Sequence, residues 1–544
     1  MLADFIASHF SGTFNYDLPT RLRYATDASV YKELPIGVAF PKNEEEIIEL
    51  IKLANAQHFT LIARAAGTSL AGQVVGKGVV MDMSQTFSNI LEVNVDKQYA
   101  RIQPGVVRDE LNMQLQPLGV FFAPETATSN RCRIGGMCGN NSCGANSLLY
   151  GSTRQHILEL KVILHDGSTA TFKTLDSAEL ETKTLLNNAE GEIYRQVLKL
   201  LQPVDIQDNI RKEFPNKNLQ RRSMGYAIDE LIDLKPFTDN GADFNFCPLI
   251  VGSEGTLAVI TEITVKLTPL PPKNRALFIT ETATIEDALQ GNLLVLPHHP
   301  AAIELIDKTI LDLAKQNITQ NKNRFFLKGD PAAILVSDII EDSEDTINQK
   351  IIDIEKELKA QNIGTAYTIV RGDDIAKVWA LRKAGLGIMS NVKGDAKPVT
   401  VVEDVAVEPS LYPAYYQEFS KLLQKYNLKC AFYAHISTGE LHNKPIFNLK
   451  DAEEVKKFRD FAYENALLVK KVGGSLSGEH GDGRLRGEFL SLMIGEKNYH
   501  ICQEIKNIFD PEHIFNEGKI VNAPKMNEHL RYSSDFELHT KELE

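Results

Sequence analysis

Two glycine-rich segments constrain the fold of this chain more than any other feature. Residues 64–72 (RAAGTSLAG) contain two glycines, and residues 134–144 (IGGMCGNNSCG) contain four glycines in eleven positions. Glycine permits positive φ and close approach of the backbone, so successive N–H groups can point at an anion. Neither segment matches the GxGxxG dinucleotide fingerprint or the GxxxxGK[ST] phosphate loop. Each segment alone is also compatible with an ordinary tight turn, so its meaning depends on the surrounding elements.

The elements predicted around these segments mix helices and strands irregularly. Residues 43–57 repeat apolar side chains on one helical face, with acidic residues in the first turn. Asp166 and Gly167 predict a hairpin turn between two short strands. Strands are predicted at residues 60–63, 78–83, 90–95, 99–104, 158–164 and 169–172, and a second helix at 107–118. This irregular order favours an α+β fold over a regular doubly wound sheet.

Composition and charge exclude several classes of protein. The 59 basic and 72 acidic residues give a net charge of −13 over 544 residues, whereas binding to nucleic acid phosphates needs a basic face. The sequence has no apolar run near the ~18 residues of a membrane-spanning helix and no secretory signal at its start. Six cysteines are too few for a disulfide scaffold. We expect a cytoplasmic enzyme of several domains, with peripheral attachment to the inner membrane left open.

A cluster of prolines, Pro269, Pro271 and Pro272, marks the best domain boundary. Beyond it, strands are predicted at residues 276–280, 333–339, 399–407 and 430–436, and helices at 344–358, 373–383, 411–426 and 452–472. The predicted divisions are a first domain at 1–270, a second at 271–500, a segment at 501–522 that returns to the first, and a polar tail or linker at 523–544.

Two histidines flank a predicted turn in residues 435–442 (HISTGELH). On one continuous strand, side chains seven residues apart would point to opposite faces. Gly439 lies in a turn-like segment, however, and a hairpin folded there brings His435 and His442 within cross-strand reach. Two imidazoles placed in this way can bind zinc. Two ordinary histidines beside a turn remain the alternative from this segment alone.

A second polar cluster lies in residues 473–484 (GGSLSGEHGDGR). It places the carboxylate of Glu479 beside the imidazole of His480, among five glycines that allow a substrate to approach closely. A flexible surface loop is the alternative. Charged groups and a histidine among so many glycines favour a function.

Three cysteines near the second glycine-rich segment, Cys132, Cys138 and Cys143, raise the question of a metal or cluster site. Their spacings match neither the zinc-binding pattern nor the ferredoxin pattern. Small side chains beside a glycine-rich segment are the simpler interpretation.

Taken together, these motifs resemble the FAD-linked oxidases, a family that includes D-lactate dehydrogenases, flavin subunits of glycolate oxidases and D-2-hydroxyglutarate dehydrogenases. The resemblance extends from about Tyr24 to Val521, through PETATS, YGSTR, GSEGTL and FNEGK. It is strongest, through GGMxGNNSCGA and EDVAV, toward a branch usually fused to a C-terminal iron–sulfur domain. It implies an α+β protein with a vanillyl-alcohol-oxidase (PCMH-type) FAD-binding domain and an α+β cap domain.

The resemblance implies that the first glycine-rich segment binds the pyrophosphate of FAD and that the second runs along the flavin. Members with covalent FAD usually carry a histidine where this chain has Thr68 and Ser69, so non-covalent FAD is expected. The residues expected to bind FAD are Arg64, Ala66, Gly67, Thr68, Ser69, Leu70, Gly72, Pro124, Glu125, Thr126, Thr128, Ser129, Ile134, Gly135, Gly136, Asn140, Ser142, Gly144, Gly255, Val259, Ile260 and Asn516.

For the chemical step, the resemblance implies a metal, a base and a substrate clamp. His435, His442 and Glu479 match the divalent metal ligands of the 2-hydroxyglutarate enzymes, and zinc is the metal expected here. His480 matches the catalytic base, and Arg382 matches the arginine that grips the substrate carboxylate.

The chain departs from the pattern of the 2-hydroxyglutarate enzymes at one position. The lysine that precedes the cap-strand acid in those enzymes is Val402 here, and Lys397, a few residues earlier, is a candidate to replace it. The identity of the substrate is therefore less well defined than the type of reaction.

We expect an FAD-dependent dehydrogenase that oxidises a D-2-hydroxy acid (D-lactate, D-2-hydroxyglutarate or glycolate) to the 2-oxo acid. Residues 524–532 resemble the segment that leads into the iron–sulfur domain of fused members, so the electrons are expected to pass to an iron–sulfur domain or protein, or to a quinone. An oxidase that uses oxygen is one alternative. A flavin-binding subunit without independent activity is another, but such a subunit is expected to lose the cap residues that this chain keeps.

Overall fold

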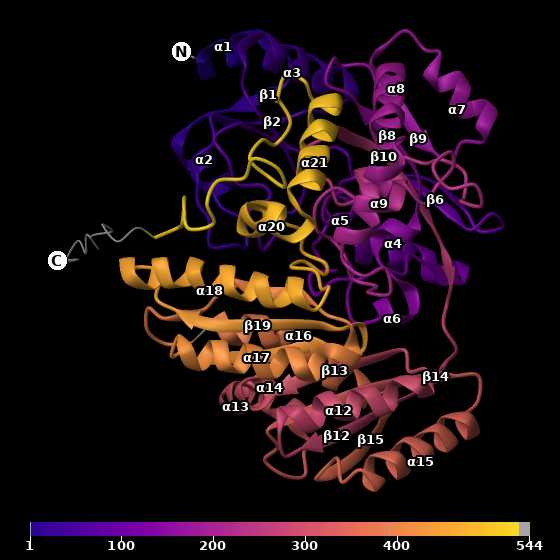
Figure 1. The fold of residues 1–544 in the computed structure, drawn as a ribbon, viewed down its shortest axis with the longest axis vertical. Helices are drawn as coiled ribbons and strands as arrows, with labels where there is room; N and C mark the ends of the chain where they lie inside the picture. The colour runs from indigo at the N-terminus through magenta and orange to yellow at the C-terminus, as the bar shows by residue number, and fades with distance from the viewer. Residues whose placement is uncertain (1, 391, 533–544) are drawn as a thin grey trace.

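Figure 1 shows two α+β domains, and the end of the chain returns from the second domain to the first. The computed structural model describes residues 2–390 and 392–532. The N-terminal domain contains residues 2–269 and the returning segment 483–532, and the cap domain contains residues 274–472. The α+β class predicted from the sequence is confirmed. Within the described residues, no helix combines the length and the apolar character needed to cross a bilayer.

A small sheet in the N-terminal domain positions the first glycine-rich segment. Its strands are, in spatial order, β1 (Thr13–Asn15), β2 (Gly37–Phe40), β4 (Val79–Asp82) and β3 (Leu61–Arg64), and β2, β4 and β3 run parallel. Helix α3 (Glu44–Gln57) connects β2 to β3. The Asn43 side chain caps its first turn by accepting a hydrogen bond from the Glu46 backbone. The predicted helix is therefore confirmed, and the glycine-rich segment begins where β3 ends.

A second, antiparallel sheet carries the rest of the N-terminal domain. Its order is β5 (Ile90–Asn94), β6 (Tyr99–Ile102), β10 (Val259–Lys266), β8 (Ile157–Ile163) and β9 (Thr169–Lys173). β8 and β9 pair antiparallel around Asp166 and Gly167, which confirms the predicted hairpin. Helix α4 (Arg108–Leu115) also agrees with the sequence prediction.

The second glycine-rich segment differs from the loop that its composition suggests. Residues Ile134–Asn140 form a short helix, α5, and Asn141 ends it in the left-handed conformation with a φ of 55°. Close packing explains why glycine occurs within it: a Cβ at Gly135 would lie 2.5 Å from the Cβ of Pro104. Tertiary contacts therefore outweigh the low helix propensity of glycine here.

The cap domain is built on one eight-stranded sheet. Its order is β15 (Ala366–Arg371), β12 (Asn274–Thr282), β14 (Ala333–Glu341), β13 (Ala302–Asp307), β18 (Cys430–His435), β19 (Glu440–Phe447) and β16 (Lys397–Pro398), with β17 (Val402–Ala406) also paired to β19. On one side lie α12 (Ile285–Val295), α15 (Glu344–Ala360), α17 (Tyr412–Lys425) and α18 (Ala452–Lys471); on the other lie α13 (Lys308–Gln316) and α16 (Asp374–Ser390). The predicted strand at 399–407 is shorter in the structure.

The returning segment packs on the N-terminal domain. Helix α21 (Glu496–Phe509) packs on α8 (Ala189–Leu201) and α9 (Val204–Glu213), and its Phe509 ring contacts Phe172 and Phe246. Residues 523–532 also contact this domain: Met526 is buried, and its carbonyl oxygen accepts a hydrogen bond from the Tyr31 hydroxyl. Residues 533–544 of the predicted polar tail lie outside the described residues.

Substitution of Gly439 tests the turn between β18 and β19. Gly439 has a φ of 77°, and a Cβ there would lie 1.8 Å from the carbonyl oxygen of Val407. We predict that Gly439→Ala lowers the free energy of unfolding by more than the ~1–3 kcal/mol of a non-glycine residue at positive φ. Gly372 is the matched control, because it has a φ of 59° in the same domain but no atom within 4 Å of a Cβ. Equal losses for Gly439→Ala and Gly372→Ala in chemical denaturation would contradict the proposed clash.

Candidate active site

The polar site of the cap domain lies on one face of its sheet. Ala431, Tyr433 and His435 alternate along β18 onto this face, and Ala431 and Tyr433 pack with the helices α13 and α16. In the antiparallel register, His435 pairs with Glu440 and Tyr433 pairs with His442. His435 and His442 therefore share a face as diagonal neighbours, with ring centroids 5.1 Å apart. This confirms the hairpin predicted around Gly439.

Three imidazole rings converge on one carboxylate oxygen. Oε1 of Glu479 lies 3.7 Å from Nε2 of His435, 3.6 Å from Nε2 of His442 and 3.3 Å from Nε2 of His480. The histidines come from the β18–β19 hairpin and from the glycine-rich loop 473–484. The fold thus brings together the two polar clusters that the sequence presents separately.

Hydrogen bonds to the opposite ring nitrogens orient these imidazoles. Nδ1 of His435 lies 2.6 Å from Oε1 of Glu304, and Nδ1 of His442 lies 2.8 Å from the backbone carbonyl oxygen of Glu403. Nδ1 of His480 lies 2.7 Å from Oε1 of Glu403. Carbonyl and carboxylate oxygens only accept, so each Nδ1 donates and each Nε2 presents its lone pair to the centre when the ring is neutral.

The donor set at this centre suits a divalent cation. One ligand atom from each of His435, Glu440, His442 and Glu479 lies within 4.8 Å of the others, and all four residues are buried. Two imidazole nitrogens and a carboxylate oxygen are the ligands of open catalytic zinc sites. Hydrogen-bonded Nδ1 atoms behind the ligating nitrogens complete that pattern. The residues predicted as metal ligands therefore fit the group.

The surroundings shift the pKa values of His442 and His480 in opposite directions. Burial lowers the pKa of His442, which favours its neutral form. Burial acts in the same direction on His480, but the carboxylates of Glu403 and Asp404 outweigh it and raise the pKa of His480 well above its usual value. Burial alone would raise the pKa of Glu479, and the opposing positive charge of Arg221 contributes to holding it well below its usual value.

A bulge in β17 aims two acidic side chains at the loop 473–484. The register between β17 and β19 shifts between Val402 and Val405, and the residues between them are Glu403 and Asp404. The Asp404 carboxylate accepts hydrogen bonds from the Ser477 hydroxyl and from the backbone N–H groups of Glu479 and His480. This acid therefore fixes the loop that carries the predicted base.

The predicted substrate clamp is partly engaged within the protein. Nε of Arg382 donates to Oε2 of Glu304 at 2.6 Å, and the guanidinium lies 4.7 Å from the centroid of the Tyr433 ring. Its Nη2 is buried without a hydrogen-bond partner among the described residues. That donor is thus available to a ligand in the cavity that Arg382 lines.

The expectation for Lys397 is not met. Its ammonium donates to the backbone carbonyl of Val392, and it does not line the cavity. Lys444 is instead the lysine near the cap-strand acids: it is buried, and its Nζ lies 3.2 Å from Oε2 of Glu403. Lys444 therefore neutralises Glu403 from a position on the same sheet face that does not line the cavity.

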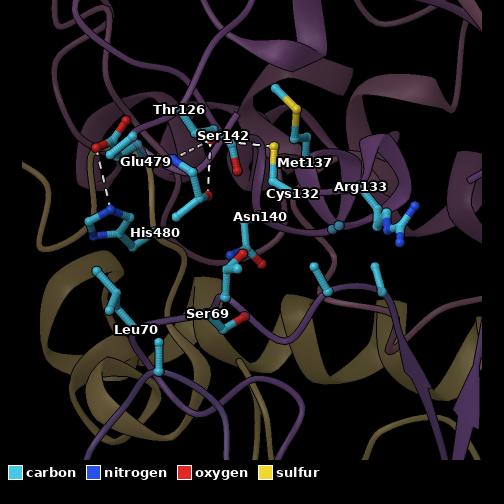
Figure 2. A pocket seen from close by; sticks show the side chains of 18 of the residues that line it. Ser69, Leu70, Thr126, Cys132, Arg133, Met137, Asn140, Ser142, Glu479 and His480 are labelled. Carbon is cyan, nitrogen blue, oxygen red and sulfur yellow. Dashed lines mark hydrogen bonds and ion pairs between the residues drawn. The ribbon is translucent and has the colours of Figure 1, made fainter. Parts of the chain in front are cut away.

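One cavity of 780 Å³ joins the glycine-rich segments to the cap residues. Cofactor pockets usually span about 300–1,000 Å³, so this one is large. Figure 2 shows side chains from both segments around the same hollow as the loop 473–484: Ser69, Leu70, Asn140, Ser142, Glu479 and His480. The cap residues on its wall are Arg275, Glu304, Trp379, Arg382, Lys383, Tyr433, His435 and His442.

Most residues predicted to bind FAD line this cavity. They are Arg64, Ala66, Gly67, Thr68, Ser69, Leu70, Glu125, Thr126, Thr128, Gly135, Gly136, Asn140, Ser142, Gly144, Gly255 and Ile260. Six others do not line it: Gly72, Pro124, Ser129, Ile134, Val259 and Asn516. Asn516 supports the wall, since its amide donates to the backbone carbonyls of Gln73 and Glu254, two residues that do line the cavity.

The cavity wall fits a flavin dinucleotide. Backbone at Gly67, Gly136 and Gly139 lines it without intervening side chains, which suits close contact with phosphates. Oε1 of Gln73, another lining residue, is a buried acceptor without a partner among the described residues, and a ring N–H could satisfy it.

The three cysteines do not assemble a metal site. Cys132 and Cys143 line the cavity, whereas Cys138 is buried behind it. Burial raises the pKa of all three thiols, that of Cys143 to about 12, so they remain neutral. Within the described ranges, the groups of side chains able to hold a metal contain no cysteine.

Arg221 is a site residue that the sequence analysis missed. It is 1% exposed and lies in the irregular segment between α9 and α10 (Ile228–Leu231) of the N-terminal domain. Its Nη2 donates to the carbonyl of Gly144 at 2.6 Å, and its Nε donates to Thr438 at 2.7 Å. Its Nη1 contacts the carboxylate of Glu440 and lies 3.1 Å from Oε2 of Glu479. One guanidinium therefore joins the second glycine-rich segment to the proposed metal ligands.

Four other site residues were given no role from the sequence, although two of them belong to the EDVAV motif: Glu304, Glu403, Asp404 and Lys444. The sequence did contain one indication, because residues 399–407 (VTVVEDVAV) place two acids inside an apolar run. Acids in such a run are buried and need partners. Glu304 has no comparable indication.

Two family models match separate parts of the chain. Residues 35–173 match the FAD binding domain, and residues 271–520 match the C-terminal domain of FAD linked oxidases. The chain therefore contains both domains of the FAD-linked oxidases and belongs to this family of oxidoreductases.

The curated relatives are dehydrogenases and oxidase subunits for 2-hydroxy acids by name. D-2-hydroxyglutarate dehydrogenase of Haemophilus influenzae is 33% identical over 95% of this chain and 51% of its own length. Glycolate oxidase subunit GlcD of Bacillus subtilis is 23% identical over 94% of both chains. The chain thus spans about half the length of the D-2-hydroxyglutarate dehydrogenases that it matches.

A solved structure of p-cresol methylhydroxylase with bound substrate superimposes with a TM-score of 0.66 at 13% identity, over 97% of this chain and 96% of that chain. This similarity concerns the fold, and it agrees with the PCMH-type architecture expected from the sequence.

Removal of the Arg221 guanidinium tests its structural role. Arg221→Met leaves the buried carboxylates of Glu440 and Glu479 without their cation, and we predict a loss of about 3–5 kcal/mol in the free energy of unfolding. The control is Arg195→Met, because Arg195 is exposed and its pair with Glu192 lies at the surface; such pairs contribute about 0–1 kcal/mol. Chemical denaturation that gives the same loss for both variants would contradict this role.

Proposed function

We propose that the protein is an FAD-dependent dehydrogenase that oxidises a D-2-hydroxy acid to the corresponding 2-oxo acid. One observation carries the proposal: a single cavity is lined by the glycine-rich segments and also by Arg382, His435, His442, Glu479 and His480. A hydride donor held by the cap residues would therefore face a flavin held by the N-terminal domain. When bound, FAD supplies the two-electron acceptor for such an oxidation.

Two residues have separate proposed roles, one in proton transfer and one in binding the substrate carboxylate. His480 is the proposed general base, because its Nε2 faces the centre while Glu403 holds its Nδ1. The carboxylates that raise its pKa favour the protonated ring, and a divalent cation bound at the centre would favour the neutral ring that accepts a proton. Arg382 is the proposed carboxylate clamp, since its side chain lines the cavity and its Nη2 has no hydrogen-bond partner among the described residues. Fixing the carboxylate would orient the Cα–H bond toward the flavin domain.

His435, His442 and Glu479 are the proposed ligands of a divalent metal, with zinc the preferred candidate. A metal bound there would supply Lewis-acid activation of the substrate hydroxyl. Support comes from the converging Nε2 atoms and their engaged Nδ1 atoms.

D-2-Hydroxyglutarate, D-lactate and glycolate are the candidate substrates, and the names of the relatives favour the first. The proposed route for the electrons is to an iron–sulfur domain or protein, or to a quinone, in the cytoplasm or at the inner membrane surface. A flavin-binding subunit without independent activity is the alternative. That alternative does not explain why Arg382, His435 and His442 of the cap line the same cavity as the glycine-rich segments.

Dye-coupled turnover tests the function. We predict that purified protein contains FAD that denaturation releases intact, and that it reduces an artificial dye with D-2-hydroxy acids but not with their L enantiomers. The panel contains D- and L-2-hydroxyglutarate, D- and L-lactate, and glycolate. FAD-loaded protein that reduces dye with none of these acids would support the alternative of a subunit without activity.

Substitution of His480 tests the proposed base. His480→Ala is expected to lower kcat by roughly 10²–10⁴, the usual contribution of a general base, while FAD remains bound. His513→Ala is the control, because the His513 side chain is 37% exposed and does not line the cavity. Unchanged kcat in His480→Ala, measured with saturating substrate and dye, would assign the base to another residue.

A further inference from the structure

Glu304 connects two groups that the proposed mechanism treats separately. It lies on β13, is 1% exposed and lines the cavity. Its Oε1 lies 2.6 Å from Nδ1 of His435, and its Oε2 accepts from Nε of Arg382 at 2.6 Å. Each oxygen of one carboxylate therefore serves a different partner, one at the proposed metal site and one at the proposed clamp.

The strand register explains this placement. β13 pairs with β18 through Leu305 and Ala434, so the next step along the antiparallel register brings Glu304 opposite His435. Both side chains then point to the same face of the sheet. Arg382 reaches this point from α16, where its guanidinium is stacked on Tyr433.

The two proposed metal-binding histidines differ in how their rings are fixed. Nδ1 of His442 donates to a backbone carbonyl oxygen, that of Glu403, which no side-chain substitution removes. Nδ1 of His435 depends on the side chain of Glu304. If that acceptor is lost, the His435 proton can move to Nε2, where it blocks the lone pair that faces the centre.

We propose that Glu304 is a positioning residue that holds His435 in its metal-binding tautomer and at the same time orients Arg382 for the substrate carboxylate. The inference rests on the metal site of the proposed function. It adds that His435 and Arg382 share the carboxylate of Glu304. A substitution at Arg382 can therefore change which hydrogen bond the side chain at position 304 makes to His435.

Glutamine at position 304 separates the two contacts. Its amide offers one acceptor oxygen and one NH2 donor, whereas His435 and Arg382 both present N–H donors. In Glu304→Gln the amide can satisfy only one of them, and the charged guanidinium competes strongly for the oxygen. In the double variant Glu304→Gln/Arg382→Met that competition is absent, so the oxygen can turn to His435.

The test is direct titration of FAD-loaded, metal-free protein with Zn²⁺ alone, by calorimetry or chelator competition. We expect Glu304→Gln to weaken Zn²⁺ binding by about 10–100-fold, as loss of a partner behind a ligand does. Arg382→Met should bind Zn²⁺ as tightly as the unmodified chain or more tightly, because Glu304 keeps its contact with His435. The double variant should bind more tightly than Glu304→Gln.

The matched control is Glu281→Gln. Glu281 lies on β12 of the same sheet, is 2% exposed and accepts hydrogen bonds from the backbone N–H groups of Lys328 and Gly329. Its substitution removes a buried negative charge away from the cavity and should leave Zn²⁺ binding unchanged. An equal loss in Glu281→Gln and Glu304→Gln would overturn the inference, because it would reflect general destabilisation.

The outcomes also separate this inference from the proposed function. Zn²⁺ binding by the unmodified chain with equal affinity in Glu304→Gln refutes the inference alone. A double variant no tighter than Glu304→Gln refutes the shared carboxylate. Absence of Zn²⁺ binding by the unmodified chain refutes the proposed metal site and this inference together. If Glu304→Gln fails to fold, the Arg382→Met titration still tests the inference. Weaker Zn²⁺ binding in Arg382→Met would contradict the roles assigned to Glu304 and Arg382.

Discussion

The buried ion pairs of Arg221 are the interaction on which the rest of the site depends. The arginine belongs to the N-terminal domain, yet it pairs with Glu440 and Glu479 from the cap hairpin and the following loop. A buried charge costs several kcal/mol unless it is paired, so the guanidinium of Arg221 stabilises both acidic residues in the buried site. The same guanidinium donates to Gly144 on the cavity wall. The contacts of Arg221 therefore both hold the two domains together and position Glu479, a proposed metal ligand.

The other buried acids of the site follow the same rule, and this gives the site its shape. Glu403 pairs with Lys444, and Asp404 lies 3.2 Å from a guanidinium nitrogen of Arg486. Neither cation lines the cavity. Other carboxylate contacts of the two acids are to His480: Oε1 of Glu403 lies 2.7 Å from its Nδ1, and the Asp404 carboxylate accepts a hydrogen bond from its backbone N–H. The polar face of the cap sheet is thus neutralised by cations that do not line the cavity, and the glycine-rich segments of the N-terminal domain complete the cavity wall.

Local features of this arrangement could be predicted, and long-range ones could not. Gly439, in a turn-like segment between the two histidines, predicted the hairpin that unites His435 and His442, because turn chemistry acts over a few residues. Helix α3 followed from helical periodicity, and the β8–β9 hairpin followed from the turn residues Asp166 and Gly167. Glu304 was missed because β13 is buried on both faces and shows no alternation. Arg221 was missed because it lies in an irregular segment and meets a partner 219 residues away. Helix α5 was not predicted, because tertiary packing overrides the low helix propensity of its glycines.

We expect the flavin and the hydroxy acid to meet in one cavity between the domains. Anaerobic titration of the FAD-loaded protein with D-2-hydroxyglutarate and D-lactate, followed by flavin absorbance, tests it most directly. We predict that at least one D acid bleaches the flavin band completely, with one 2-oxo acid formed per FAD, and that the L enantiomers leave the band unchanged. Bound FAD that dithionite reduces but that no 2-hydroxy acid bleaches would contradict it.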